Sequence, residues 1–157
     1  MQDGPGKEEL ADGSKYEGEF KNGKKHGSGT YHWADESVYV GQWADNMIEG
    51  DGEYRWPDGR VYKGQWKNNK LHGKGVYTWA DGRRYEGEYI NEKKEGFGSY
   101  FWPDGKSYEG QWLNGKQHGE GRFTNTKGKS KFGVWENGER IKWIDDKSSL
   151  KSKSSLT

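Results

Sequence analysis

Aromatic residues and glycines alternate with polar residues in a short block that recurs along the chain. The block begins as Tyr16-Glu-Gly-Glu-Phe20, and copies of it start at positions 39, 62, 85, 108 and, in a degraded form, 131. Successive copies are therefore 23 residues apart throughout. Because alternate side chains of a β-strand point to opposite faces, each block predicts a strand with one aromatic face and one solvated face.

A second block keeps the same period. It starts as Gly27-Ser-Gly29, continues to Tyr31 and Trp33, and returns from positions 50, 73, 96 and 119. Turn signals such as Asn22-Gly23 and Asp58-Gly59 separate the blocks, and they supply the positive φ that tight hairpins require. Connections this short make chain neighbours antiparallel sheet neighbours, so the predicted fold is all-β, a single-layer antiparallel meander of about twelve strands.

A one-layer sheet has no second layer to cover its aromatic face. We therefore expect the rings to lie flat over neighbouring strands, with glycines at the crossed positions leaving room for them. The main role of the aromatic columns is then to form a thin core. Aromatic residues make up 15% of the chain and glycine contributes 26 residues, which agrees with such a core.

Charge and composition narrow the classes of function. The net charge of +1 gives no general attraction to nucleic acid, so no nucleic-acid partner is expected. The chain has no cysteine, and no apolar run approaches the roughly 20 residues of a membrane span. The first residues lack the basic and apolar regions of a signal peptide, so the expected location is cytoplasmic.

The repeats also predict the domain organisation. Residues 1–15 form a degenerate half-repeat that is either an N-terminal cap or the cut end of a longer array. Residues 16–130 form five tandem repeats, and residues 131–146 form a partial sixth repeat and a C-terminal cap. Residues 147–157 are rich in Ser and Lys and are expected to be disordered.

No set of residues predicts catalysis, so we expect a protein that is not an enzyme and uses no metal or cofactor. The most suggestive set is His26, His72 and His118, which share one repeat column with Glu49 and Glu95. Equivalent positions in adjacent repeats are roughly 9–10 Å apart, whereas zinc holds nitrogen ligands at about 2.1 Å. These residues are interpreted as loop residues with modest charge pairing.

Part of the aromatic face of a one-layer sheet stays accessible, which favours a groove that binds a helix or an extended peptide of a partner protein. The candidate groove residues come from the central columns: Trp43, Tyr54, Trp56, Tyr62, Trp66, Tyr77, Trp79, Tyr85 and Tyr100. Phe97 and Phe101 fall on the otherwise polar face, where they form a second contact patch or cover local backbone.

Anionic lipid is the alternative ligand. Lysines gather in the loops at one end of the hairpins: Lys21, Lys24, Lys25, Lys67, Lys70, Lys93, Lys94 and Lys116. Each lysine near an anionic membrane contributes about 1 kcal/mol. Acidic residues such as Asp45 and Glu92 share these loops and dilute the patch. Lipid binding is therefore expected to be weak and to be lost at physiological salt.

The pattern Y-x-G-x-W followed by G-x-G-x-x-x-x-W-x-D-G resembles the MORN (membrane occupation and recognition nexus) repeat over residues 4–138. The resemblance implies a curved single-layer antiparallel sheet with a groove. Such arrays occur in junctophilins, in radial-spoke head proteins of cilia, in cytoskeletal scaffolds of protists and in larger enzymes whose catalytic domain lies elsewhere.

From these features together we expect a protein–protein interaction scaffold of the cytoskeleton or of a cilium. The alternatives are a phosphoinositide or membrane-surface binding module and the regulatory MORN segment of a larger enzyme. Unpaired terminal strands also allow a homodimer to form through a sheet edge, whereas the degraded last repeat and Trp143 are equally consistent with a cap that prevents it.

Overall fold

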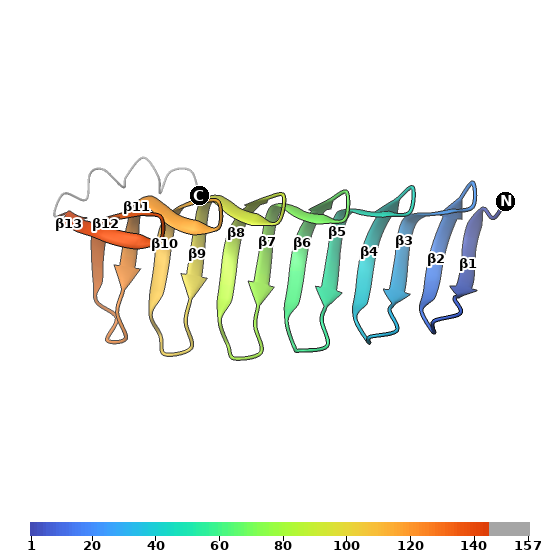
Figure 1. Ribbon diagram of the computed structural model, residues 1–157, viewed down its shortest axis with the longest axis horizontal. Coiled ribbons are helices and arrows are strands. Elements are labelled where there is room, and N and C mark those ends of the chain that lie inside the picture. The colour runs from blue at the N-terminus through green and yellow to red at the C-terminus, as the bar shows by residue number, and fades with distance from the viewer. Residues whose placement is uncertain (145–157) are drawn as a thin grey trace. The chain divides into compact units, whose positions relative to one another are not determined.

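The computed structural model describes residues 1–144 as strands joined by tight turns (Figure 1). The chain divides into two compact units, Met1–Ala80 and Asp81–Thr157. The first unit contains β1 (Gly4–Glu9), β2 (Lys15–Lys21), β3 (Lys24–His32), β4 (Val38–Ala44), β5 (Met47–Arg55), β6 (Val61–Lys67) and β7 (Lys70–Thr78). The described part of the second unit contains β8 (Arg84–Ile90), β9 (Lys93–Phe101), β10 (Ser107–Leu113), β11 (Lys116–Thr124), β12 (Ser130–Glu136) and β13 (Glu139–Ile144).

Within each unit the strands pair antiparallel in chain order. The predicted all-β, single-layer antiparallel meander is therefore confirmed. Residues 1–144 contain thirteen strands rather than about twelve, because β13 pairs with β12 although it lacks the glycines of the other second strands. No helix that could cross a membrane occurs in this part of the chain. The predicted disordered tail, residues 147–157, lies outside the described residues.

The core centres on the tyrosine that opens each first strand. All five are at most 1% exposed: Tyr16, Tyr39, Tyr62, Tyr85 and Tyr108. The Tyr62 hydroxyl donates a hydrogen bond to the carbonyl of Gln65 at 3.1 Å. Its ring crosses Gly75 of the neighbouring strand, where an added Cβ would lie 2.3 Å from the ring carbon Cζ. Glycine is therefore required at the crossed position, as the one-layer argument predicted.

The aromatic residue that ends each first strand joins adjacent repeats. The Tyr39 ring meets Trp43 of its own strand at 5.3 Å between centroids and Trp66 of the next repeat at 5.6 Å, both edge to face. The Trp66 indole N–H donates to the carbonyl of Gly52 at 3.1 Å. Each repeat is thus completed by its successor, as in other repeat arrays.

Each full second strand bends at a bulge. In β7, His72, Gly73 and Lys74 together face the single residue Gln65 of β6, and Gly73 has a φ of 81°. The bulge releases the backbone N–H of Lys74 from the ladder, and the Gln65 side-chain oxygen accepts it at 2.8 Å. The alternating Gln or Glu of the first strand therefore satisfies a backbone donor.

The Asn-containing turns adopt the predicted left-handed backbone, with φ of 52° at Asn22 and 79° at Gly23. Such a turn also docks on the preceding repeat. The Asn46 side chain accepts the N–H of Lys25 at 2.8 Å, and the Asn46 N–H donates to the carbonyl of Lys25 at 3.0 Å. Asn69 makes the same pair of bonds to Ile48. These clamps hold neighbouring hairpins in register.

Candidate interaction surface

The second strands of the first unit carry aromatic side chains that stay partly accessible. Six of them form a row at the ends of β3, β5 and β7, which we name the aromatic rail: Tyr31, Trp33, Tyr54, Trp56, Tyr77 and Trp79. Successive rings lie 4.4–5.4 Å apart between centroids and are tilted by 31–44°. Aromatic rings at these separations attract one another, so the row is a preformed surface.

The rail differs from the core in exposure and in hydrogen bonding. Tyr77 is its most enclosed ring, at 9% exposed, and the others are half-buried. The core indole of Trp43 donates its N–H to the carbonyl of Gly29 at 3.1 Å. Within residues 1–144, by contrast, the indole N–H groups of Trp33 and Trp56 have no acceptor. The rail therefore presents both apolar area and hydrogen-bond donors.

A shallow cavity of about 370 Å³ lies beside the rail and is lined by Lys25, Tyr31, Trp33, Trp43, Asn46, Ile48, Tyr54 and Asn69. The Lys25 Nζ lies 5.5 Å from the ring centroid of Tyr31 and 5.6 Å from that of Trp43. In the next two repeats Ile48 and Leu71 stand at the position of Lys25, and both are buried. The cavity is therefore lined by aromatic rings and Ile48 together with polar groups, and one cation lies at its margin.

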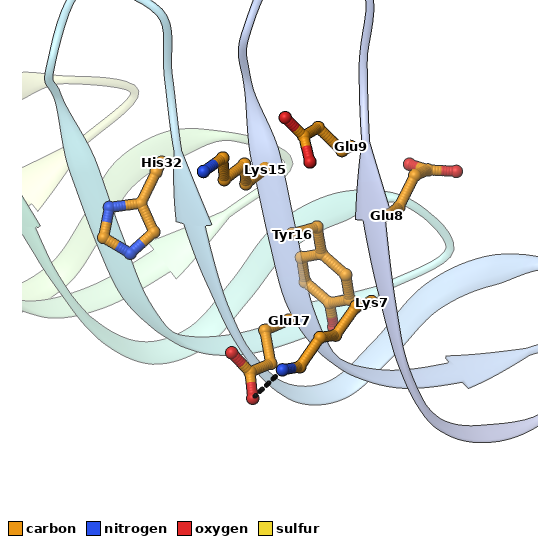
Figure 2. A pocket seen from close by; sticks show the side chains of 7 residues that line it. All are labelled: Lys7, Glu8, Glu9, Lys15, Tyr16, Glu17 and His32. Atoms are coloured by element: carbon orange, nitrogen blue, oxygen red, sulfur yellow. Dashed lines mark ion pairs between the residues drawn. The ribbon is translucent and has the colours of Figure 1, made fainter.

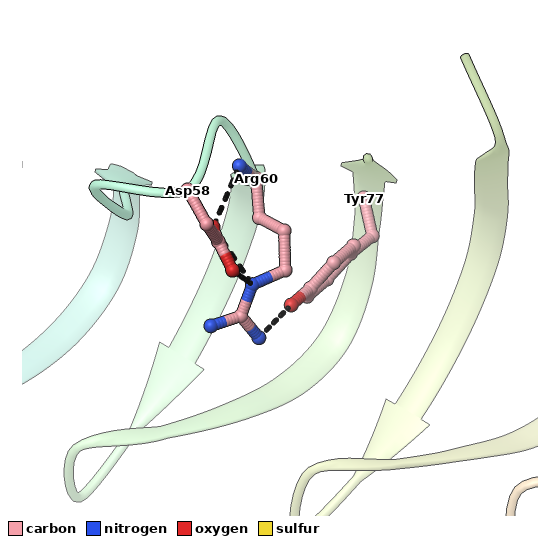
Figure 3. A network of polar contacts seen from close by, with 3 residues as sticks. All are labelled: Asp58, Arg60 and Tyr77. Carbon is pink, nitrogen blue, oxygen red and sulfur yellow. Dashed lines mark hydrogen bonds and ion pairs between the residues drawn. The ribbon is translucent and has the colours of Figure 1, made fainter. Parts of the chain in front are cut away.

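Arg60 lies between Asp58 of its own turn and Tyr77 of the next repeat (Figure 3). Its guanidinium lies 4.8 Å from the Trp56 centroid and donates to the Tyr77 hydroxyl at 3.0 Å. Asp58 holds Arg60 through a 2.8 Å ion pair. Hydrogen bonds from the backbone and side chain of Arg60 lower the pKa of the Asp58 carboxyl. Both groups are charged, so the negative charge of Asp58 and the positive charge of Arg60 cancel within this turn.

The turn after Trp33 lacks such a cation. Ser37 stands where Arg60 stands in the next repeat, and it is 1% exposed. The Asp35 carboxylate accepts the backbone N–H of Ser37 at 2.9 Å, and this bond lowers the pKa of the carboxyl. Glu36 beside it is exposed. Neither carboxylate has an ion-pair partner among residues 1–144, so negative charge remains at the Trp33 end of the rail.

The structure places some of the predicted groove residues in the core and others in the rail. Four are 0–7% exposed and belong to the core: Trp43, Tyr62, Trp66 and Tyr85. Four others are members of the rail: Tyr54, Trp56, Tyr77 and Trp79. Tyr100 is half-buried in the second unit, 4.6 Å from the ring of Trp102. Sequence reasoning left Tyr31 and Trp33 out of the groove, although they occupy the same repeat columns as the rail residues it included.

Phe97 and Phe101 are half-buried on the face of the second unit opposite the core tyrosines. The Arg84 guanidinium lies 4.4 Å from the Phe101 ring centroid, and Arg84 also pairs with Glu86 at 2.6 Å. Phe101 is thus partly covered by an ion pair. Phe97 lies opposite Gln111 of β10.

The loop lysines also fall into two groups. Six are exposed: Lys21, Lys24, Lys67, Lys70, Lys93 and Lys116. The other two, Lys25 and Lys94, are half-buried over aromatic rings. Burial, with a smaller contribution from the charge of Arg83, lowers the pKa of the Lys94 ammonium. These two cations lie over core rings and are less accessible than the other six.

Three members of the His and Glu column, His26, Glu49 and Glu95, make contacts between repeats. Glu49 accepts the N–H of Asn68 at 3.1 Å, and Glu95 accepts that of Asn114 at 2.9 Å. His26 lies 3.9 Å from Asp45. In residues 1–144 no three or more His, Cys, Asp or Glu side chains are grouped so that they could hold a metal ion.

A cavity of about 560 Å³ lies at the β1 end of the first unit, lined by Lys7, Glu8, Glu9, Lys15, Tyr16, Glu17 and His32 (Figure 2). Lys7 and Glu17 form an ion pair there at 3.9 Å, with both side chains at least 70% exposed. Charges of both signs mix in this cavity, and among residues 1–144 Tyr16 is the only Tyr, Trp or Phe that lines it. The aromatic rail is therefore the stronger candidate for a binding surface.

A family model of the MORN repeat matches residues 16–38, 39–59, 62–83, 85–107 and 108–130. No curated protein matches the chain's sequence. Among solved structures, a mutant TCP10 domain of Danio rerio CPAP is similar, with 16% identity and a TM-score of 0.40 over 88% of this chain and 70% of that one. The TCP domain of Drosophila melanogaster SAS-4 (dCPAP), in complex with a proline-rich motif of Ana2 (dSTIL), is similar with 13% identity and a TM-score of 0.43 over 90% of each chain. Likeness at this level carries no argument about what this chain binds.

Proposed function

Because this chain belongs to the MORN repeat family, we propose that it is a protein–protein interaction scaffold whose aromatic rail binds a segment of a partner protein. The observation that carries the proposal is the row of six partly accessible rings in contact with one another. Trp and Tyr dominate the energetic centres of protein interfaces. A contiguous row of partly accessible apolar side chains is typical of an interaction site.

The cavity beside the rail supports the same proposal. Ile48 and the rings of Trp43 and Tyr54 give it walls that a partner side chain would dehydrate on entering. Asn46 and Asn69 stand at its rim with their side-chain oxygens already bonded to Lys25 and Ile48. A pocket with aromatic walls and a few placed polar groups is a usual form of a binding site for an anchor residue.

The test is selection of random displayed peptides on the intact chain, followed by affinity measurement of each enriched peptide against two variants. Trp56→Ala removes a ring from the rail, and Val40→Glu changes a side chain that is 50% exposed on the opposite face of the first unit. Enriched peptides should bind Trp56→Ala at least about tenfold more weakly, the effect of losing an aromatic anchor, and should bind Val40→Glu normally.

Peptides that bind Trp56→Ala as well as the unchanged chain would refute the rail as the binding surface. So would flotation of the chain with anionic vesicles at physiological salt when no rail-dependent peptide is found. That second result would establish the membrane-surface function in place of the scaffold. A thermal melt of each variant shows whether a loss of binding arises from unfolding.

The scaffold is further proposed to act in the cytoskeleton or a cilium, since the MORN proteins that the sequence resembles include cytoskeletal scaffolds and radial-spoke head proteins. The intact chain should remain in the detergent-insoluble cytoskeletal fraction of its source cells, and Trp56→Ala should be released. Complete extraction of the unchanged chain by detergent would contradict this part of the proposal.

A further inference from the structure

The rail has a period that a ligand must match. Each repeat contributes two strands, and neighbouring strands lie about 4.8 Å apart. Trp33, Trp56 and Trp79 therefore recur about every 9.6 Å along the first unit. A segment that contacts all three must present similar side chains on one face at that interval.

Among regular backbone conformations, polyproline II has this interval. It rises about 3.1 Å per residue with three residues per turn, so every third residue returns to the same face after about 9.3 Å. Two turns of an α-helix rise about 10.8 Å, and a β-strand returns to the same face after about 6.8 Å. Between Trp33 and Trp79 the α-helix would fall out of step with the rail by about 2.4 Å and polyproline II by about 0.6 Å, whereas the β-strand is already out of step after one repeat.

The chemistry of the rail fits the same conformation. Proline rings pack on aromatic side chains, and polyproline II segments dock in grooves that such side chains line. A polyproline II backbone makes no internal hydrogen bonds, so its carbonyl groups are available as acceptors. The indole N–H groups of Trp33 and Trp56, which have no acceptor within residues 1–144, are the matching donors.

The charges at the two turns of the rail favour one orientation of the bound ligand. Asp35 and Glu36 leave negative charge at the Trp33 end of the rail, whereas Asp58 at the next turn is neutralised by Arg60. A basic side chain on the ligand is therefore favoured beside Trp33 and gains nothing beside Trp56. A short ion pair at a partly exposed site adds specificity more than affinity.

We propose that the partner segment is a polyproline II helix with proline at every third position and a lysine or arginine at the end that lies beside Trp33. This proposal rests on the proposed function, since it names the chemistry of the segment that the rail binds. Each 23-residue repeat of the chain adds two strands to the sheet. The spacing of these repeats is what predicts a three-residue period in the ligand.

The experiment measures binding of synthetic peptides of about nine residues, or three turns, to the intact chain. The first peptide has proline at every third position and a terminal arginine. The second has the same composition with its prolines shifted to every fourth position. The third is an amphipathic peptide of about 20 residues, which is long enough to form a helix. The first peptide should bind at least about tenfold more tightly than the other two, because only it places a proline on each repeat.

Two variants separate the contributions. Trp56→Phe keeps an aromatic ring but removes the indole N–H, and it should weaken binding of the first peptide about 3- to 10-fold, the effect of one hydrogen bond. Glu36→Lys should weaken binding of the first peptide and leave unchanged the binding of a version whose arginine is replaced by glutamine. Val40→Glu on the opposite face is the matched control and should change neither.

The outcomes distinguish the two proposals. Equal binding of the first and second peptides, or rail-dependent selection of displayed peptides without a three-residue proline period, would overturn the polyproline II inference and leave the scaffold proposal standing. Failure of every peptide, synthetic or displayed, to depend on the rail would overturn both. Tighter binding of the first peptide that is unaffected by Trp56→Phe would also overturn the inference, since the indole donors would then have no part in recognition.

Discussion

The tyrosine that opens each repeat links the glycine columns to the stability of the fold. Tyr62 lies flat across Gly64 and Gly75, and its hydroxyl reaches the carbonyl of Gln65. The ring is completely buried although the sheet has only one layer. Glycine and tyrosine therefore depend on one another at this position, and a change in either disturbs both.

Gly75→Ala should destabilise the chain by about 1–3 kcal/mol or more, the cost of overpacking a well-packed core. The added Cβ would lie 2.1 Å from the Tyr62 hydroxyl oxygen and would displace the ring. Urea unfolding measures the loss. Gly115→Asn is the control, because Gly115 has open space around its Cβ position and a φ of 84° that asparagine tolerates. A stable Gly75→Ala protein would show that the ring does not need this space.

Trp66→Ala should cost about 3–5 kcal/mol, because it removes a large core side chain. Trp66 is 7% exposed and its indole N–H is bonded to Gly52. Trp56→Ala should cost less, since Trp56 is half-buried and its indole N–H has no acceptor within residues 1–144. Thermal melts of both variants give the comparison. Equal losses would mean that the rail and the core are not energetically distinct.

The buried tyrosines make stability depend on alkaline pH. Burial raises the pKa of Tyr62 to about 12 and also raises that of Tyr39. Ionisation of the unfolded chain near pH 10 therefore favours unfolding before the folded hydroxyls lose their protons. Stability should be unaffected below about pH 10 and should fall as pH rises toward 12. Urea midpoints measured at pH 9 and pH 11 test this, and identical midpoints would contradict it.

At the scale of the element, each β-hairpin depends on the bulge that bends its second strand. The bulge in β7 is stabilised by the bond from the N–H of Lys74 to the side chain of Gln65. In the first repeat Glu19 does the same for Ser28 at 2.7 Å. A carboxylate and an amide are therefore interchangeable acceptors at this position.

Gln65→Leu should destabilise the chain by about 0.5–1.5 kcal/mol, the net value of one hydrogen bond. Gln65→Glu should retain the stability of the unchanged chain, because Glu19 already fills the role in another repeat. Chemical unfolding of both variants checks the expectation. If the two variants lose the same stability, the side-chain acceptor is not what supports the bulge.

At the scale of the whole molecule, the periodic pattern was sufficient to predict the strands and their antiparallel order. Tight turns at Asn22-Gly23 were predictable because only certain residues adopt positive φ without strain. The 23-residue period then placed every later hairpin. These features depend on local geometry, which sequence patterns report directly.

The division between core and rail was not predictable in the same way. Trp43 and Trp56 stand on the same predicted face, and alternation alone does not distinguish them. Their exposure depends on which ring crosses a glycine and which is covered by the next repeat. The inward position of Lys25 was also missed, although its repeat column, which contains Ile48 and Leu71, carried the signal.

The most direct test of the rail is an NMR titration of the isotopically labelled chain with a selected peptide. The indole N–H resonances report which tryptophans the peptide contacts. The resonances of Trp33 and Trp56 should shift with the peptide, because their N–H groups have no acceptor within residues 1–144 and are available to the ligand. Those of Trp43 and Trp66 should stay in place, because they are bonded within the core. Shifts confined to residues around Phe97 and Phe101, or to the loop lysines, would contradict the rail as the binding surface.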